Sequence, residues 1–335
     1  MTPRPSPKMI GLQGTATRVS VFSMAKPLVS VVIVTFESQD DIGECVQSVI
    51  ASDIALEIIV IDNASLDNTV EEAARIASHS PSCRLIRNRE NVGFARAVNQ
   101  GIRVARGEYF LVVNPDCTLQ PDTVRTALTV IQASPDAALA GCMLLNIDGT
   151  EQAGARRYFP TPWRALVRVL RLNRFARLHP RFHCFLMNRE PVPSHPVEVE
   201  AISGAFMLAR RSAIEQVGML DEGYFMHCED LDWCVRFGQA GWKVLFVPQA
   251  QVVHKRGRSS RTRPIKVELY KHRGMIRYYR KFLRYRYPEI MLWGVTAAVW
   301  TRFMARATVL LLWETSELSP STAHELPKTV QSYAG

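Results

Sequence analysis

The sequence predicts an α/β protein in which helices flank a mostly parallel sheet, followed by a helical extension at the C-terminus. Two observations indicate the sheet: apolar runs rich in Val and Ile alternate with amphipathic segments in the first third of the chain, and each run ends in polar residues. A third observation indicates the extension, because a long apolar stretch occupies residues 290–313.

The first half gives the clearest pattern of elements. We expect strands at residues 28–36, 56–65, 83–88 and 109–113, and helices at residues 40–51, 67–78 and 93–105. Asp67 and Glu71 suit the positive N-terminal end of the second helix. Pro115 cannot donate to a sheet ladder and therefore ends the last of these strands. Repeated strand–helix alternation predicts parallel strands joined by right-handed crossovers.

The second half is less regular. A helix is expected after Pro162, within residues 158–178. Its basic face is formed by Arg164, Arg168 and Arg171, and its apolar face is formed by Leu166, Val167 and Leu170. Such a helix suits a membrane surface, and a solvated face is an equally good interpretation. A Pro-rich loop follows at 188–196. A further helix opens at Glu229 and stops before Gly241, and an apolar strand then ends at His254.

Charge is unevenly distributed over the 335 residues. Residues 1–150 carry 12 basic and 16 acidic side chains, whereas residues 151–335 carry 29 and 15, which accounts for the net charge of +10. The basic half favours anionic partners or an anionic membrane surface. Seven dispersed cysteines form no CxxC pair, so we expect reduced thiols rather than a disulfide framework or a zinc knuckle.

The N-terminal 25 residues lack the apolar core of a signal peptide, and their polar composition predicts a disordered tail, with Met24 a candidate start. The remainder divides into two halves of one domain, at 26–120 and 121–260, and a helical C-terminal segment at 261–335.

Polar groups stand at the carboxyl ends of the predicted strands, where ligands bind in parallel α/β sheets. Thr35 and Glu37 follow the first strand, Asp62 ends the second, and Asn114 and Asp116 follow the fourth. Turn chemistry alone explains one such site, but the repetition favours a ligand site. GxGxxG and GxxxxGK[ST] motifs are absent from the strand–helix turns, which argues against a dehydrogenase or a P-loop NTPase.

A second group of carboxylates opens the helix at 229. Glu229, Asp230 and Asp232 complement a helix dipole, and Asp232 is spaced to pair with Arg236. The preceding residues "YFM" would shield the group from water, and a partly desolvated carboxylate has a raised pKa, which would suit a general base. His254 adjoins a basic loop, so it is either a structural residue or a contact to phosphate or metal.

Several segments resemble, in order, glycosyltransferase family 2, and in particular its bacterial rhamnosyltransferase-like members. These segments are "VSVVIVTFES", "VIDNASLDNT", "NRENVGFARAVNQGI", "FLVVNPD" and the long run from "SGAFMLARR" to "FVPQAQVVH". Together they extend over roughly residues 28–256.

The resemblance implies a GT-A fold, which is Rossmann-like, with a nucleotide-sugar donor, a divalent cation (Mg²⁺ or Mn²⁺) and inversion at the anomeric carbon. It places the donor against Thr35, Glu37, Asp62, Asn91, Arg96 and Asn114. It assigns the metal to Asp116 and His254, and the base to Asp230, with Glu229 as the next candidate. Asn114 departs from the DxD pattern of the family, which leaves Asp116 as the main metal ligand.

The chemistry of sugar transfer requires the same groups. A cation neutralises the charge that builds on the departing nucleoside diphosphate, and a carboxylate takes the proton of the attacking hydroxyl. The transition state is oxocarbenium-like.

Arg302 and Arg306 interrupt the C-terminal apolar stretch. We therefore expect a helix that packs on the domain or lies at the membrane interface rather than one that spans the membrane.

The leading hypothesis is an inverting glycosyltransferase of cell-surface polysaccharide synthesis, acting on a glycan or a lipid-diphosphate-linked acceptor. We expect it in the cytoplasm, peripherally bound to the inner face of the cell membrane, with no nucleic acid partner. The alternatives are a sugar nucleotidyltransferase, which would need a Gly-rich phosphate loop, and a non-catalytic lipid- or nucleic-acid-binding module on a degenerate transferase fold.

Overall fold

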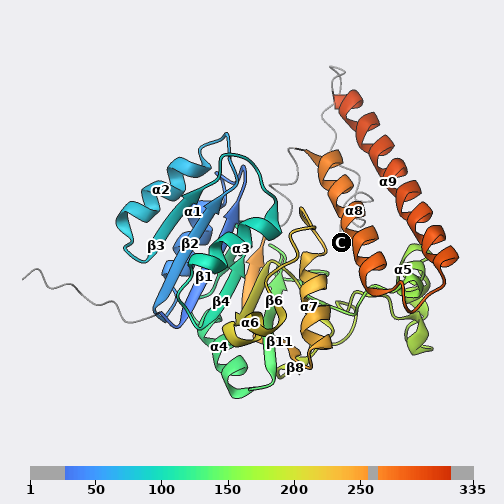
Figure 1. The fold of residues 1–335 in the computed structure, drawn as a ribbon, viewed down its shortest axis with the longest axis horizontal. Helices are drawn as coiled ribbons and strands as arrows, with labels where there is room; N and C mark the ends of the chain where they lie inside the picture. Colours follow the sequence, from blue (N-terminus) through green and yellow to red (C-terminus); the bar gives the residue numbers. More distant parts are fainter. Residues whose placement is uncertain (1–26, 256–262, 318–335) are drawn as a thin grey trace, which may run out of the picture.

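The computed structural model describes residues 27–255 and 263–317, and side chains only as far as residue 312. The predicted tail at 1–25 and most of the basic loop after His254 therefore lie outside the described residues. A mixed nine-stranded sheet forms the centre of the molecule, in the order β3-β2-β1-β4-β10-β6-β11-β5, with β8 paired to β11 (Figure 1).

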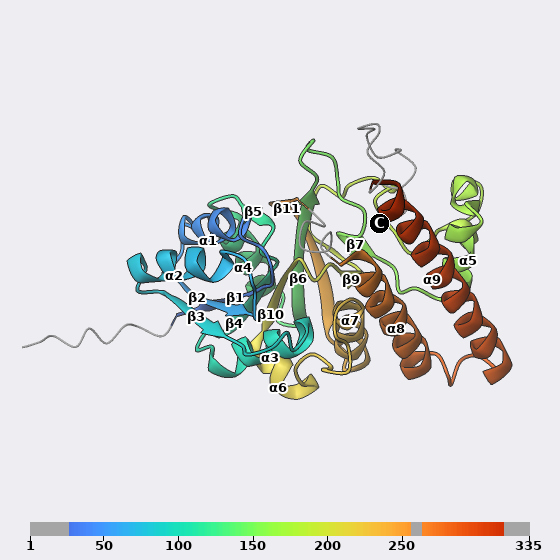
Figure 2. The same cartoon turned by 90° about the horizontal axis from the view of Figure 1, so that it is seen from above.

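The first half has the predicted βα alternation. Its strands are β1 (Val29–Thr35), β2 (Leu56–Asp62), β3 (Cys83–Arg87) and β4 (Tyr109–Val113), and its helices are α1 (Ile42–Ile50), α2 (Thr69–His79) and α3 (Phe94–Val104). All four strands run parallel. Every residue of β1, β2 and β4 is buried, because α1 and α2 cover one face of the sheet and α3 covers the other (Figure 2).

The second half extends the same sheet with strands of both directions. The elements are β5 (Cys117–Leu119), α4 (Thr123–Ala133), β6 (Ala137–Leu145), β7 (Arg156–Arg157), β8 (Val197–Glu198), β9 (Ala201–Ile202), β10 (Phe206–Arg210), α6 (Arg211–Val217), α7 (Glu229–Gln239) and β11 (Lys243–His254). β10 is antiparallel to both of its neighbours, whereas β11 is parallel to β6. The predicted parallel arrangement therefore holds for the first half, and the second half is mixed.

The helix expected within 158–178 is shorter than predicted. α5 covers Pro162–Val169, and two 3-10 turns follow, η1 (Leu172–Phe175) and η2 (Pro180–Phe182). Thr161 caps the start of α5, and the left-handed backbone of Arg171 (φ 54°) breaks the helix before η1.

Of the expected apolar face, Val167 is buried, whereas Leu166 and, directly after the helix, Leu170 are exposed. Arg164 pairs with Glu200, and Arg168 stacks over the ring of Phe185, so both cations are engaged within the chain.

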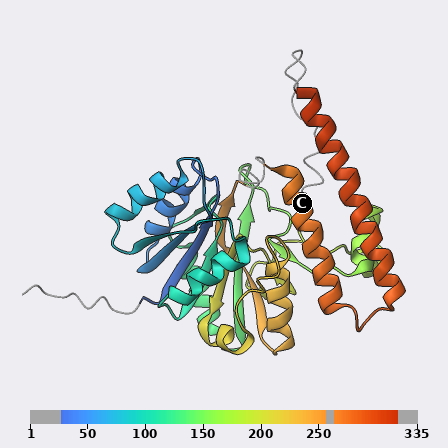
Figure 3. The ribbon, with the colours of Figure 1, turned by 45° about the horizontal axis from the view of Figure 1, so that its top comes forward.

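Two C-terminal helices form a separate layer beside α7 (Figure 3). α8 covers Pro264–Phe282, and α9 covers Glu289–Glu317 and packs along α8. Glu289–Leu312 is long and apolar enough to cross a membrane by length and composition alone, although it contains Arg302 and Arg306. The helix that we expect to pack on the domain or to lie at the membrane interface stays a prediction.

All seven cysteines are free thiols, as predicted. Gly241 has a positive φ of 84° directly after α7, which confirms it as the residue that ends this helix.

The packing of α3 on β1 leads to a first prediction. A Cβ atom at Gly101 would lie 2.4 Å from Cγ1 of Val32, on a fully buried strand. Gly101→Ala should therefore lower the free energy of unfolding by about 1–3 kcal/mol, measured by urea denaturation. Gly238→Ala in α7 is the control, because a Cβ there meets open space and should stabilise the helix by up to about 1 kcal/mol. Equal effects of the two substitutions would contradict this packing.

Candidate active site

The carboxyl ends of β1 and β2 bring Thr35 and Asp62 side by side, since these residues pair in the sheet register. Asp62 is buried and accepts two hydrogen bonds from Ser65, from the backbone N–H at 3.1 Å and from the hydroxyl at 2.6 Å. The hydroxyl of Thr35 is fully buried and has no hydrogen-bond partner among the described residues. A buried polar group without a partner is costly, so this hydroxyl fits a position that a ligand completes.

Backbone strain accompanies these strand ends. Glu37 and Ala64 have positive φ angles of 49° and 62° although neither is glycine. Such conformations cluster at binding sites, where the surrounding structure enforces them. Arg263, from the start of the C-terminal extension, lies 3.4 Å from a carboxylate oxygen of Glu37.

Asp116 and His254 meet where β5 pairs with the end of β11. The Nε2 atom of His254 lies 3.1 Å from Oδ1 of Asp116, and both residues are buried. Cys117 offers a third potential ligand atom within 4.8 Å. Burial raises the pKa of the Cys117 thiol well above its usual range, so the group stays a neutral thiol and a weak ligand.

A carboxylate oxygen and an imidazole nitrogen form a donor set that suits a divalent cation, because both are common ligands and both carry lone pairs. The residues that the structure places together therefore fit the metal that the sequence predicted at Asp116 and His254. Asn114 is held through its backbone, whose N–H donates to the carbonyl of Ala205 at 3.0 Å.

The turn at Gly204 and Ala205 joins the two predicted acidic centres. The Gly204 N–H donates to Oδ2 of Asp230 at 3.0 Å, and the next residue, Ala205, accepts from the Asn114 backbone. Asp230 is thereby fixed to the same turn that positions the segment carrying Asp116. Backbone groups of two consecutive residues therefore connect Asp230 with the segment that carries Asn114 and Asp116.

The two adjacent carboxylates at the start of α7 have opposite electrostatics. Burial raises the pKa of Glu229, the charge of Asp230 raises it further, and the result is about 8. Burial alone would also raise the pKa of Asp230. The charge and hydrogen bond of Arg157 outweigh burial, with help from the N–H groups of Gly204 and Leu231, and lower that pKa below its usual value.

The raised pKa expected of a shielded carboxylate is therefore found at Glu229, whereas the pKa of Asp230, the expected base, is lowered. Oε2 of Glu229 is buried without a hydrogen-bond partner among the described residues. The residues immediately before it, His227 and Cys228, both have left-handed backbone conformations, which sets the abrupt entry into α7.

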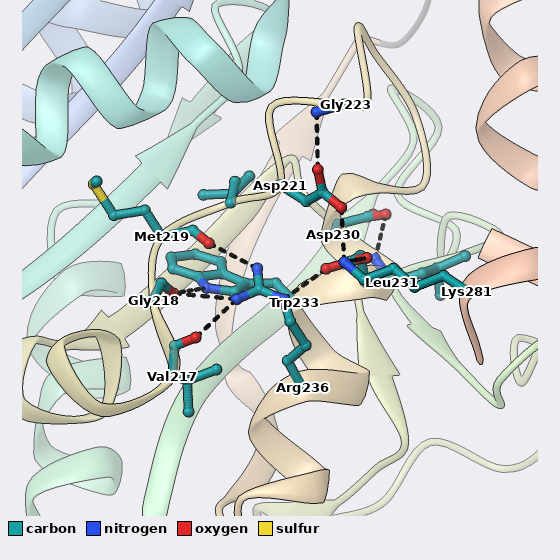
Figure 4. Close-up of polar contacts among 12 residues, drawn as sticks. Val217, Gly218, Met219, Asp221, Gly223, Asp230, Leu231, Trp233, Arg236 and Lys281 are labelled. Atoms are coloured by element: carbon teal, nitrogen blue, oxygen red, sulfur yellow. Dashed lines mark hydrogen bonds and ion pairs between the residues drawn. The ribbon is translucent and has the colours of Figure 1, made fainter. Parts of the chain in front are cut away.

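A buried ion network holds the first turn of α7 (Figure 4). Asp232 is fully buried and receives Nε of Arg236 at 2.6 Å and Nζ of Lys281 at 2.6 Å. Lys281 belongs to α8 and also contacts Asp221 at 2.7 Å. The guanidinium of Arg236 donates to backbone carbonyls at 217–219, so the loop before α7 is tied to the same network.

The loop before α7 carries the two aromatic residues of the segment "YFM". Tyr224 is buried, and Phe225 stacks on Tyr270 of α8 with ring centroids 4.0 Å apart. The carbonyl of Phe225 accepts the N–H of Phe94 at 2.6 Å, and a Cβ at Gly93 would lie 2.7 Å from that carbonyl oxygen. This loop is therefore closely packed on the N-terminus of α3, and its shielding of the carboxylates stays a prediction.

Two predicted donor residues have roles within the chain. Asn91 accepts the N–H of Gly93 at 3.0 Å and so forms the turn before α3. Arg96 is about half exposed and pairs with Glu222 at 3.2 Å. The described contacts do not link either side chain to Asp116.

Sequence reasoning missed three residues that the structure places at this site: Arg157 beside Asp230, Gln152 beside His254, and Lys281 beside Asp232. None lies in a motif, and each reaches the site from an element distant in sequence. Only the pairing of Asp232 with Arg236 carried a local signal, the i,i+4 spacing, and the structure confirms it.

The fold and these acidic centres define a glycosyltransferase with a GT-A fold. The family model described as glycosyl transferase family 2 matches residues 30–218, and the chain belongs to this family.

Relatives include the N-acetylglucosaminyl-diphospho-decaprenol L-rhamnosyltransferase of Mycobacterium tuberculosis, 31% identical over 63% of this chain and 70% of that protein. The rhamnosyltransferase WbbL of Escherichia coli is 26% identical over 68% of this chain and 83% of that protein.

Solved structures agree on the fold. The mannosyltransferase PcManGT of Pyrobaculum calidifontis, in complex with GDP-Man and Mn²⁺, has a TM-score of 0.54 at 17% identity and covers 89% of this chain and 82% of its own. GalNAc-T7 with UDP, GalNAc and Mn²⁺ has a TM-score of 0.52 at 19% identity, and the match covers 69% of this chain and 44% of the GalNAc-T7 chain. The chain is therefore a glycosyltransferase, and glycosyl transfer in polysaccharide synthesis is its activity. The alternatives of a nucleotidyltransferase and a non-catalytic module lose their support.

The ion network leads to a second prediction. Lys281→Met leaves the buried carboxylate of Asp232 with one cationic partner fewer, so stability should fall by about 1–3 kcal/mol in a thermal melt. Displacement of α7 should also lower kcat about ten- to hundred-fold with little change in the KM for the donor, because catalysis depends on carboxylate position.

Lys281→Arg keeps the positive charge, so this variant should retain most of the wild-type stability and most of the wild-type kcat. Lys243→Met is the matched control, since Lys243 pairs with Asp136 on the surface and its loss should change neither stability nor kcat appreciably. Wild-type kcat in Lys281→Met would show that the network does not position α7.

Proposed function

We propose that this enzyme transfers L-rhamnose from a nucleotide donor, with inversion, to a lipid-diphosphate-linked glycan. Two relatives named as rhamnosyltransferases support the sugar, and the name of the mycobacterial relative supports an acceptor linked through a diphosphate to a polyprenol. The observation that carries the proposal is the turn at Gly204 and Ala205, because it connects Asp230 directly to the segment bearing Asn114 and Asp116.

On the donor side, Thr35, Glu37 and Asp62 would line the nucleoside pocket. The buried Thr35 hydroxyl without a partner and the strained backbone at Glu37 support this assignment. Asn91, Arg96 and Asn114 would lie along the nucleotide. Arg96 would have to exchange its contact with Glu222 for a phosphate, which a half-exposed ion pair permits at little cost.

Asp116 and His254 would hold a divalent cation, Mg²⁺ or Mn²⁺, beside the donor diphosphate. When bound, the cation neutralises the charge that develops on the leaving nucleoside diphosphate. The two structural neighbours that contain Mn²⁺ are consistent with this assignment.

Asp230 would accept the proton of the acceptor hydroxyl as that oxygen attacks the anomeric carbon. Its lowered pKa keeps it ionised at neutral pH, and Gly204 holds it toward the donor side. The contact with Arg157 weakens its basicity, so the acceptor must displace or share that cation in the reactive complex. Glu229, with its raised pKa, is the second candidate for the base.

The outer face of α9 would contact the membrane. Every exposed residue from Ile290 to Leu312 is uncharged, and Trp293, Met304 and Leu312 are each more than 60% exposed. The two arginines turn away from this face: Arg306 lies 3.4 Å from Glu268 of α8, and Arg302 is partly buried. An apolar face of this extent on a helix backed by a basic one suits lipid contact.

α5 lies beside α9 (Figures 1 and 2), and it carries exposed apolar side chains at Trp163, Leu166 and Val169, followed by the exposed Leu170. We therefore place the enzyme in the cytoplasm, peripherally bound to the inner face of the membrane that carries its acceptor. A bilayer surface would bring the lipid-linked acceptor to the active site, and nucleic acid has no part in this proposal.

The proposal predicts transfer with purified protein. With Mn²⁺ and a polyprenyl-diphosphate-linked N-acetylglucosamine acceptor, dTDP-rhamnose should support product formation, whereas UDP- and GDP-sugars should not. Asp230→Asn keeps shape and hydrogen bonding but cannot take a proton, so turnover should fall by about 10²–10⁴-fold with unchanged donor binding. Transfer only from another nucleotide sugar would refute rhamnose as the donor sugar.

The pH dependence of kcat/KM identifies the base. The pKa of Asp230 is lowered below the usual value of an aspartate, so this carboxylate stays ionised throughout the range from pH 8 to pH 5. If Asp230 is the base, kcat/KM should therefore stay level over that range. If Glu229 were the base, with a pKa of about 8, kcat/KM should fall about tenfold per pH unit below 8. Glu229→Gln should abolish activity only in the second case.

A further prediction concerns the membrane. The chain should sediment with anionic liposomes, and charges at two exposed positions, Trp293→Glu with Met304→Glu, should lower the bound fraction about tenfold or more because they oppose burial of the α9 face. Ile147→Glu is the control, since Ile147 is as exposed but lies on neither α5 nor α9. Equal binding by both variants would exclude α9 as the contact.

A further inference from the structure

Gln152 is a buried side chain that touches a predicted metal ligand and that the reaction chemistry does not use. It is 3% exposed and lies in the segment between β6 and β7. Its amide reaches across to the end of β11, where it contacts both the ring and the backbone of His254. We propose that Gln152 is a positioning residue that fixes the tautomer of His254 and so directs its Nε2 lone pair toward the cation held with Asp116.

The orientation of the Gln152 amide follows from its neighbours. Nε2 lies 3.0 Å from the backbone carbonyl of His254 and 3.1 Å from Oδ1 of Asn146. A backbone carbonyl only accepts hydrogen bonds, so the NH₂ group must be on this side, and its two hydrogens serve these two acceptors. The amide oxygen is therefore turned to the imidazole.

The tautomer of His254 follows in turn. Oε1 of Gln152 lies 2.6 Å from Nδ1 of His254, and an amide oxygen only accepts. Nδ1 must then carry the proton, which leaves Nε2 of the neutral ring with its lone pair. That lone pair faces Oδ1 of Asp116 at 3.1 Å.

Two lone pairs at this distance repel unless a proton or a metal cation lies between them. A divalent cation ligated by Nε2 and Oδ1 removes this repulsion, and the inference rests on the metal of the proposed function. A hydrogen bond from the second ring nitrogen commonly orients metal-binding histidines, and its loss typically costs 10–100-fold in metal affinity. All hydrogen-bonding groups of the Gln152 amide are used, so the amide cannot turn without losing contacts.

The first experiment measures Mn²⁺ affinity by the EPR signal of the free ion. Gln152→Leu removes the acceptor at Nδ1 and should weaken Mn²⁺ binding by about 10–100-fold. Gln152→Glu keeps an acceptor oxygen at Nδ1 but loses the two N–H donors on the other side, so it should retain more Mn²⁺ affinity than Gln152→Leu and less than wild type. Gln249→Leu is the matched control. Gln249 is an exposed glutamine of β11, the strand that ends at His254, and its amide contacts the backbone of Ser194. The affinity of this variant for Mn²⁺ should be unchanged. Thermal melts without metal identify any variant that does not fold.

The second experiment observes the tautomer without metal, by ¹H–¹⁵N correlation spectra of protein labelled at histidine nitrogen. The His254 signals, assigned by their loss in His254→Gln, should report a protonated Nδ1 in wild type and a mixture of tautomers in Gln152→Leu. Unchanged Mn²⁺ affinity or an unchanged tautomer in folded Gln152→Leu would overturn the role of Gln152 and leave the metal in place. Absence of Mn²⁺ binding by wild type, with full transfer in EDTA, would overturn the metal itself and this inference with it.

Discussion

The structure of the active site depends on one short turn. The N–H of Gly204 holds Asp230, and the carbonyl of Ala205 accepts from the Asn114 backbone, so the carboxylate and the segment that carries Asp116 are fixed to the same two residues. A Cβ atom at Gly204 would lie 3.3 Å from Cβ of Asp230, which leaves little room for a larger residue. β10 follows directly and is antiparallel to β4, so the mixed direction of the second half of the sheet is what places this turn beside the end of β4.

Local pattern was sufficient where the physics is local. The buried run of β4 and its termination at Asn114–Pro115 were predictable, because a parallel strand buried on both faces needs a continuous apolar sequence and proline ends a ladder. The start of α7 at Glu229 was predictable for the same kind of reason. The partners of its carboxylates were not. Arg157 and Lys281 reach them from residues 73 and 49 positions away, and the spacing of residues in one segment does not encode such contacts.

The directions of the pKa shifts of neighbouring residues could not be predicted from the sequence either, because they depend on contacts that only the structure shows. Glu229 and Asp230 are adjacent carboxylates, both largely buried, and yet their pKa values move in opposite directions. The charge of Arg157 lowers both pKa values, but its hydrogen bond and those of two backbone N–H groups go to Asp230, so only there do they outweigh burial. The sequence of α9 similarly suggested that two arginines interrupt its apolar face. In the structure Arg306 contacts Glu268 of α8, Arg302 is partly buried, and the exposed residues from Ile290 to Leu312 are uncharged.

The position of Lys281 determines where the C-terminal region divides functionally. α8 supplies a cation to the fully buried Asp232, so it is part of the catalytic unit, whereas α9 meets the rest of the chain mainly through α8. The natural joint between the two is the short connection at 283–288. Exchange of α9, the helix that we propose to contact the membrane, between family members should therefore be made at this joint, because a cut before α8 would remove one of the two cations that pair with the buried Asp232.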